Sequence, residues 1–129
     1  MGLRFIARGI AAFGLAALTT LAGAGETAYS QSAFDQDVAA GKPVIVDFAA
    51  SWCPTCKAQK PVVDALMKEP ARKDVTLFKA DYDTESALKK KLRVTQQSTF
   101  VVFKGGKEVG RSTGETDRAA IATLFDKAL

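Results

Sequence analysis

The feature that most limits how this chain can fold is the apolar run PVIVDFAA, residues 43–50. The run is short and rich in β-branched side chains, and Asp47 is its one charged residue. Such a run is typical of a β-strand that is covered on both faces, as in a sheet with helices on either side. We therefore expect it to form a central strand.

Helical patterns flank this strand. Before it, SAFDQDVAAGKP predicts a helix, because Ser32 and Asp35 form a capping-box arrangement and Gly41 followed by Pro43 provides a stop. After it, KAQKPVVDALMKEP predicts a helix with one apolar face. Pro61 lies inside this second helix and is expected to kink it.

The remaining patterns complete one α/β domain. VTLFKADY predicts a strand, TESALKKKL a helix, and TFVVFKGGKEVGRS a hairpin across Gly105 and Gly106. A C-terminal helix with an apolar stripe is predicted to begin at Thr116 and Asp117. This order places parallel strands before an antiparallel hairpin in a single sheet. The predicted fold class is α/β, with a central mixed β-sheet flanked by helices.

The first 24 residues are predicted to be a secretory signal. Arg4 and Arg8 precede an apolar run, and small residues follow it as far as Ala24. The run is shorter than the roughly 20 residues of a membrane-spanning helix. We therefore expect cleavage after about Ala24, with a retained anchor on the outer face of the inner membrane as the alternative. The expected organisation is a signal at 1–24 and one domain at 25–129.

Composition narrows the chemistry. The chain has 129 residues, two cysteines and no histidine, and its formal net charge is +4. The lack of histidine excludes Cys–His nucleophilic pairs and histidine metal ligands. Without Arg4 and Arg8 of the predicted signal the charge is 4 − 2 = +2, which is too small to indicate nucleic acid or another polyanion as a partner. Any chemistry must therefore use thiols, carboxylates and amines.

The cysteines of WCPTC allow three interpretations. As a structural staple, a bond between Cys53 and Cys56 would constrain the unfolded chain by only about 2 kcal/mol. As a metal site, the two thiolates would supply only part of the roughly four ligands that such a site needs, which leaves a site shared between two subunits as an open alternative. In the third interpretation the cysteines are a redox pair, and the position of each residue in the motif then has a physical explanation.

The redox interpretation follows from where the cysteines fall. Cys53 ends the strand and precedes the helix, where unpaired backbone N–H groups and the helix dipole stabilise a thiolate and lower its pKa. Pro54 suits the first helical turn. Cys56 comes three residues later, within bonding range and turned into the protein. We therefore expect Cys53 to be the nucleophile and Cys56 the resolving thiol.

Three neighbours of the pair carry their own alternatives. A buried Asp47 would need partners or a raised pKa, and we expect it to relay a proton to Cys56 rather than to face water at a strand edge. Trp52 is expected either at the rim of the site or in the core beneath the loop. Lys57 is expected to be a solvated helix residue that adds positive potential rather than a catalytic group.

The string VIVDFAASWCPTCKAQKP resembles the active-site segment of the thioredoxin family. The resemblance continues through FKADYD and TFVVFKGGKEVGRSTG and covers about Ser32 to Leu129. It implies a thioredoxin-like fold and a thiol–disulfide exchange activity that uses no cofactor and no metal. By position, it implies that Asp47 is the family's buried acid, Lys79 the lysine beside it, and Gly114 a glycine close to the substrate surface.

One position departs from the family. Its members usually carry a cis-proline facing the redox pair, whereas QQSTFVVF places Ser98 there, and all four prolines lie at or before Pro70. A cis bond before a non-proline residue costs about 2.5–4 kcal/mol, so we expect the Gln97–Ser98 bond to be trans. In the family this loop pairs with substrate through its backbone. Here Ser98 either becomes a polar neighbour of the sulfurs or opens the site to a metal or cluster.

The predicted signal at residues 1–24 leads us to expect export to the periplasm. Together with the exchange activity that the resemblance implies, it predicts an exported thiol–disulfide oxidoreductase that reduces disulfides in exported proteins. A reductase in an oxidising compartment needs an outside electron source, and the resemblance implies a membrane donor of the DsbD or CcdA type. Asp47 with Lys79 resembles the reducing branch of the family. The dipeptide between the cysteines, Pro54 and Thr55, matches the commonest dipeptide of neither the reducing nor the oxidising branch, so disulfide formation stays an alternative. The second class of function is a binding module that uses the fold to dock a partner, with little turnover. The single domain is expected to be a monomer.

Overall fold

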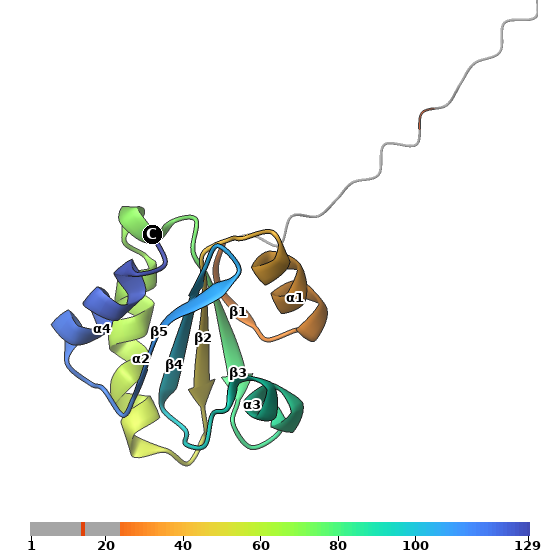
Figure 1. Ribbon diagram of the computed structural model, residues 1–129. Coiled ribbons are helices and arrows are strands. Elements are labelled where there is room, and N and C mark those ends of the chain that lie inside the picture. The colour runs from red at the N-terminus through yellow and green to blue at the C-terminus, as the bar shows by residue number, and fades with distance from the viewer. Residues whose placement is uncertain (1–13, 15–23) are drawn as a thin grey trace, which may run out of the picture.

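Within residues 24–129, five strands form one mixed sheet in the order β1-β3-β2-β4-β5, and four α-helices flank it (Figure 1). The computed structural model describes residue 14 and residues 24–129. The predicted α/β class with a mixed central sheet is confirmed. The elements are β1 (Gly25–Ala28), α1 (Gln31–Ala39), β2 (Val44–Ala49), α2 (Pro54–Met67), a 3-10 helix η1 (Pro70–Arg72), β3 (Thr76–Asp81), α3 (Ser86–Leu92), β4 (Thr99–Lys104), β5 (Lys107–Thr113) and α4 (Arg118–Asp126).

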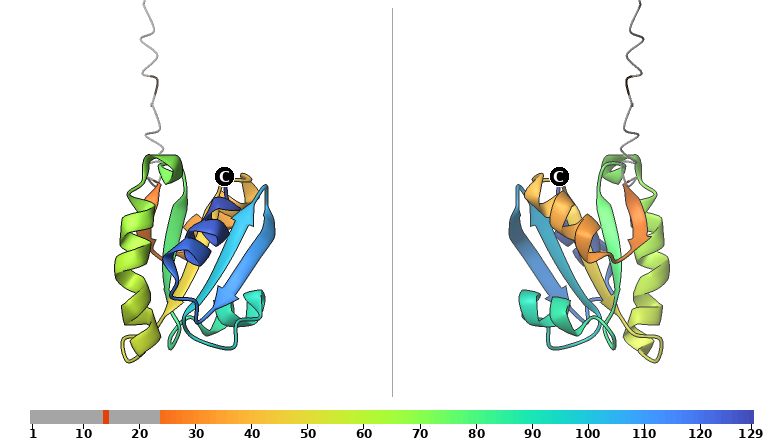
Figure 2. Two further views of the ribbon diagram at one scale, coloured as in Figure 1. Left: turned by 90° about the vertical axis from the view of Figure 1, so that its left-hand side faces the viewer. Right: turned by 90° about the vertical axis from the view of Figure 1, so that its right-hand side faces the viewer.

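The predicted central strand is β2. It pairs in parallel with β3 on one side and antiparallel with β4 on the other. Its residues from Val44 to Phe48 are all buried. A strand buried on both faces needs cover on both, and here α2 and α4 cover one face of the sheet while α1 and α3 cover the other (Figures 1 and 2).

Alternate side chains of β2 enter two separate cores. Ile45 packs with residues of α2 and α4, whereas Val44, Val46 and Phe48 pack on the side of α1 and α3. Because successive strand residues point to opposite faces, Asp47 lies on the same face as Ile45. The strand pattern therefore aims this carboxyl group toward α2.

The helix α2 presents the predicted apolar face to the core. Val63 and Leu66 are each 1% exposed and belong to the core on that side of the sheet. Pro61 lies inside the helix, which nevertheless continues to Met67. The proline therefore does not end the helix, and the kink expected there stays a prediction.

The predicted hairpin consists of β4 and β5. Its turn contains Gly105 and Gly106, whose φ angles of 60° and 80° suit the tight turns that need two residues with positive φ. Along β4, Thr99 pairs with Phe48 near the carboxyl end of β2. The residue before β4, Ser98, is thereby brought to the end of the central strand.

In the N-terminal part of the domain, one expectation is corrected and one strand is added. The helix α1 begins with Ser30 as its N-cap rather than Ser32, and the Ser30 hydroxyl accepts a hydrogen bond from the Ala33 N–H at 3.4 Å. Strand β1 was not predicted, because GETA has neither β-branched enrichment nor apolar alternation. It is a strand because its backbone pairs in parallel with β3.

The predicted signal at residues 1–24 lies outside the described residues, apart from residues 14 and 24. Among the described residues, none of the helices combines the length and apolar character needed to cross a bilayer. Cleavage and retention of the leader both stay predictions.

Candidate active site

Cys53 lies between β2 and α2, where it is the N-cap residue of the helix. Its backbone is extended, with φ −86° and ψ 113°, and its Sγ accepts a hydrogen bond from the Cys56 N–H at 3.1 Å. Pro54 takes the first helical turn, where a missing N–H leaves no bond unmade. The sulfur thus replaces the usual capping oxygen and lies at the positive end of the helix dipole.

Ser98 lies against both sulfurs. Its Oγ is 3.0 Å from the Cys53 Sγ and 3.1 Å from the Cys56 Sγ, and the residue is 2% exposed. The Gln97–Ser98 bond is trans, as predicted, since the described residues contain no cis peptide bond. Ser98 has a φ of 60°, in the left-handed region that non-glycine residues seldom adopt.

The exposure of the two cysteines differs from what the redox interpretation predicts. A nucleophilic Cys53 with Cys56 turned into the protein predicts that Cys53 is the more exposed residue, but Cys53 is 1% exposed and Cys56 is 8% exposed. Ser98 covers the pair because β4 delivers it to the end of β2, a contact that the local pattern around WCPTC does not reveal.

The environment separates the acidities of the two thiols. Burial by itself raises the pKa of Cys53, but hydrogen bonds from the Cys56 and Ser98 side chains and from backbone N–H groups outweigh it, so this pKa is lowered. Burial, followed by the neighbouring Cys53 sulfur, raises the pKa of Cys56. Cys53 therefore ionises first, in agreement with its predicted role as the nucleophile.

Asp47 is buried on β2, with an exposed fraction of 9%. Its Oδ1 has no hydrogen-bond partner among the described residues. Burial is the main cause that raises the pKa of Asp47 to about 7, although the nearby positive charge of Lys79 opposes it. The alternative of a water-facing carboxylate at a strand edge is wrong, and the group is suited to exchanging a proton near neutral pH.

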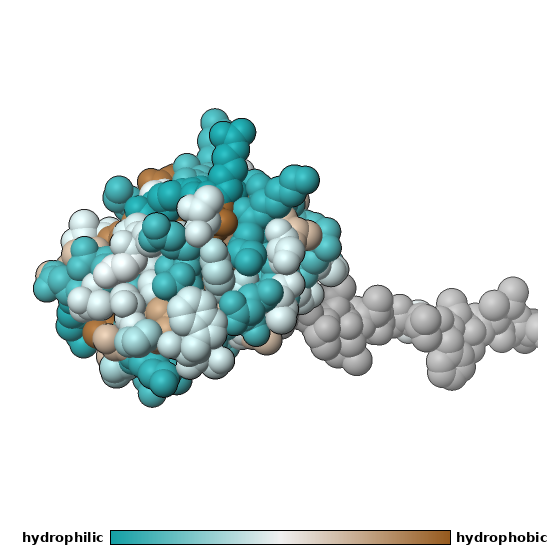
Figure 3. Space-filling view, turned by 90° about the horizontal axis from the view of Figure 1, so that it is seen from below, coloured by the Kyte–Doolittle hydropathy of each residue, from teal (hydrophilic) through white to brown (hydrophobic). Residues whose placement is uncertain are grey.

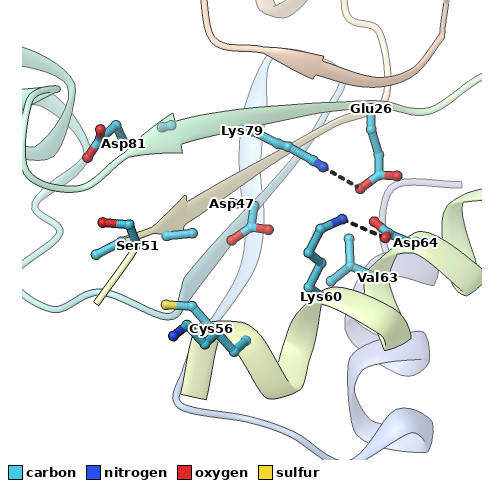
Figure 4. A pocket seen from close by; sticks show the side chains of 13 residues that line it. Glu26, Asp47, Ser51, Cys56, Lys60, Val63, Asp64, Lys79 and Asp81 are labelled. Atoms are coloured by element: carbon cyan, nitrogen blue, oxygen red, sulfur yellow. Dashed lines mark hydrogen bonds and ion pairs between the residues drawn. The ribbon is translucent and has the colours of Figure 1, made fainter. Parts of the chain in front are cut away.

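Asp47 and Cys56 line the same pocket of about 410 Å³ (Figure 4). Lys79 also lines it and is the register partner of Asp47 on β3, but its ammonium group lies 3.3 Å from the Glu26 carboxylate. On α2, Lys60 pairs with Asp64 at 2.7 Å. The pocket thus joins the resolving thiol to a buried acid with charged groups around it.

Two residues of the site carried no signal in the sequence. Glu26 comes from the unpredicted strand β1. Gln59 is 2% exposed, and its Nε2 donates to the carbonyl oxygens of Glu115 at 2.8 Å and Ser98 at 3.4 Å. A polar residue in the α2 pattern would suggest solvent exposure, so only the packing of the Ser98 loop reveals its role.

The cysteines lie where β2 ends and α2 begins, at the lower end of the molecule as drawn in Figure 1. Trp52 is 56% exposed and its indole N–H donates to Asp83 at 2.8 Å, so it belongs to the rim rather than the core. This end shows pale and apolar residues interspersed with hydrophilic ones (Figure 3). Of the other residues expected at the active-site surface, Pro54, Thr55, Lys57, Gln97 and Gly114 are exposed or half-buried. The expectation is wrong for Ser98, which is buried because its N–H is bonded to the Phe48 carbonyl and its hydroxyl lies against the two sulfurs.

The charged and sulfur-bearing groups of the site do not form a ready metal centre in the part of the chain that the structure describes. There, no group of three or more His, Cys, Asp or Glu side chains is placed to hold a metal ion. The arrangement can instead support nucleophilic attack by Cys53, attack by Cys56 on the resulting bond, and proton exchange with Asp47.

Comparison with known proteins gives consistent matches. The profile of the family described as Thioredoxin matches residues 26–127. A thioredoxin from Chlamydia trachomatis is 38% identical over 98 residues, which span 76% of this chain and 93% of that protein. A thioredoxin from Mycobacterium tuberculosis is 37% identical over 93 residues, which span 71% and 79%. The crystal structure of Trxlp from Edwardsiella tarda matches with a TM-score of 0.74 and 43% identity, over 78% of this chain and 96% of that one.

The matches and the geometry lead to the same assignment. The matched region contains the sheet, the helix that begins at the cysteines, and the buried acid behind them. The chain therefore belongs to the thioredoxin family and is a thiol–disulfide oxidoreductase with Cys53 and Cys56 as its redox pair.

Proposed function

We propose that the protein is exported and reduces disulfide bonds in other exported proteins through a cycle of Cys53 and Cys56. The observation that carries the chemistry is a sulfur held at the start of α2, 3.1 Å from the Cys56 N–H and with a lowered pKa. Arg4 and Arg8 before an apolar run support export. The ion-paired Lys79 near Asp47 supports the reducing direction by resemblance to the family.

The cycle begins when the Cys53 thiolate attacks one sulfur of a substrate disulfide. A bond forms between Cys53 and that sulfur, the substrate disulfide breaks, and the second substrate sulfur leaves as a thiolate that takes up a proton. Because Cys53 is 1% exposed, the substrate sulfur has to reach a thiolate that is buried in this structure.

The second step releases the reduced substrate. Cys56 gives its proton to Asp47 and attacks the Cys53 sulfur, so the Cys53–Cys56 disulfide forms and the bound substrate sulfur leaves. Two electrons have then passed to the substrate. A pKa of about 7 and a shared pocket with Cys56 support Asp47 as the proton acceptor.

In this proposal Ser98 takes the place of the family's cis-proline, and its loop receives the substrate backbone together with Gln97 and Gly114. Support comes from the contact of Ser98 with both sulfurs and from the Gly114 N–H, which donates to the Ser98 carbonyl at 3.0 Å. The exposed ring of Trp52 borders the same surface.

The oxidised pair must be reduced again before another cycle. A membrane donor of the DsbD or CcdA type would supply the electrons, since an oxidising compartment offers no reducing pool. The same rim beside Trp52 would have to admit this donor, because both reactions use the Cys53 sulfur.

Disulfide formation is the second candidate. The hydrogen bonds that lower the pKa of Cys53 favour it, because a stabilised thiolate makes a dithiol couple more oxidising.

Titration of the couple against glutathione, combined with insulin reduction, tests the direction. We expect a potential close to the thioredoxin value of about −270 mV rather than the DsbA value of about −120 mV. Insulin reduction with a dithiol donor should be lost in Cys53→Ser, while Cys56→Ser should accumulate a mixed disulfide. A potential near the DsbA value would assign disulfide formation instead, and silence of the wild type in the insulin assay would assign a binding module.

Export is tested separately with a reporter enzyme that is active only outside the cytoplasm. The first 30 residues fused to this reporter should give activity, and N-terminal sequencing of the full chain should show cleavage after about Ala24. A fusion lacking residues 2–21 is the control. Activity equal to that control would overturn export without affecting the exchange chemistry.

A further inference from the structure

The Ser98 hydroxyl occupies a position between the two reacting sulfurs. Its oxygen is 3.0 Å from the Cys53 Sγ and 3.1 Å from the Cys56 Sγ, and all three residues are buried. A hydroxyl has one proton to donate and lone pairs to accept with. When Cys53 is the thiolate and Cys56 the thiol, Ser98 can donate to Cys53 and accept from Cys56 at the same time.

The backbone around Ser98 holds this hydroxyl in place. The Ser98 N–H donates to the Phe48 carbonyl at 2.8 Å, at the end of the central strand. The Ser98 carbonyl accepts from the Gly114 N–H at 3.0 Å and from Gln59 Nε2 at 3.4 Å. With both backbone groups bonded, the residue is kept at a φ of 60°, and its side chain stays directed at the sulfurs.

We propose that Ser98 is a catalytic residue whose hydroxyl donates a hydrogen bond to the Cys53 thiolate and thereby raises the reduction potential of the Cys53–Cys56 couple. Oxidation of the pair forms the S–S bond, passes two electrons to the acceptor disulfide and releases the Cys56 proton. The disulfide sulfurs carry neither the negative charge nor the thiol proton. The hydroxyl therefore binds the reduced pair more strongly than the oxidised pair.

The direction of the effect follows from this difference. A group that stabilises the dithiol form makes the couple a stronger oxidant, and its removal makes the couple a stronger reductant. We expect the hydroxyl to change the equilibrium constant for exchange about tenfold. A hydrogen bond to a charged group is strong enough for this even at the lower end of its usual range. For two electrons, tenfold corresponds to about 30 mV.

Two variants remove the hydroxyl. Ser98→Ala deletes the oxygen alone. Ser98→Gly deletes it too, and glycine adopts a positive φ without strain, so this variant keeps the backbone conformation even if Ser98→Ala does not fold. Both should shift the glutathione equilibrium about tenfold toward the oxidised protein, a fall of about 30 mV in potential. In both, the pH at which Cys53 becomes reactive toward an alkylating agent should rise.

Thr99→Val is the matched control. Thr99 is also 2% exposed, but its hydroxyl bonds to the Gln96 carbonyl at 2.8 Å and the Thr113 hydroxyl at 2.9 Å rather than to the sulfurs. This variant should keep the wild-type potential. Equal potentials in wild type and both Ser98 variants would overturn the proposal, as would a shift toward stronger oxidation or a shift seen equally in Thr99→Val. The test compares variants, so it is independent of export and of the direction of the cycle.

Discussion

At the scale of single residues, Asp47 provides a buried carboxyl group that can exchange a proton near neutral pH, and its burial lowers the free energy of unfolding when the group is ionised. Its pKa is raised by burial from the ordinary 3.8 to about 7 in the folded protein. Between these values the folded state holds a proton that the unfolded state has lost. The contribution of Asp47 to the free energy of unfolding should therefore fall as pH rises from about 4 to about 7.

Replacement of Asp47 by Asn should remove this penalty. Because one pKa unit is worth about 1.4 kcal/mol, we expect Asp47→Asn to be more stable than the wild type by about 2–4 kcal/mol at pH 8, with the advantage vanishing near pH 4. Urea unfolding at the two pH values measures it. Asp64→Asn is the control, because Lys60 lowers the pKa of Asp64, so this change should bring no gain at pH 8. An advantage for Asp47→Asn that is equal at both pH values would contradict the assignment.

At the scale of elements, Arg72 joins three helices at the end of the molecule away from the cysteines. It lies in η1 and is 4% exposed, and it donates to the Leu66 carbonyl of α2, to Glu69 and to Asp126 of α4. A guanidinium can serve several acceptors at once because its donors are fixed in a planar fork. This one residue therefore holds the ends of α2 and α4 together.

Arg72→Ala should lower the free energy of unfolding by about 2–3 kcal/mol, since a buried guanidinium loses its hydrogen bond to the Leu66 carbonyl and its partly buried hydrogen bonds to Glu69 and Asp126. Arg118→Ala is the matched control: Arg118 also pairs with Glu69, at 2.8 Å, but its side chain is 57% exposed. Such a surface pair contributes about 0–1 kcal/mol. Urea unfolding should separate the two variants, and equal losses would show that the exposed pair matters as much as the buried one.

At the scale of the whole molecule, two apolar cores on opposite faces of the sheet hold the domain together. The cysteines belong to neither of these cores. The double variant Cys53→Ser with Cys56→Ser should therefore fold, and its free energy of unfolding should lie within about 2 kcal/mol of the oxidised wild type. Circular dichroism with urea unfolding measures this, and an unfolded double variant would contradict the prediction.

The sequence by itself determined the features that depend on neighbours along the chain. The run around Val44–Phe48 predicts the central strand, the two glycines predict the hairpin, and WCPTC before a helical pattern predicts a sulfur at a helix start. These follow from periodicity, turn geometry and capping, which act over a few residues. The helix-start position also predicts the lowered pKa of Cys53, to which the contact with Ser98 adds in the folded protein.

Only the tertiary structure decided which distant groups meet. It pairs β1 with β3 and so brings Glu26 to Lys79, it sets Arg72 between α2 and α4, and it lays Ser98 over both sulfurs. These contacts join residues far apart in the chain, and no local preference encodes them. They arise because the buried faces of strands and helices pack in one arrangement, and the polar groups carried along with them must then find their partners.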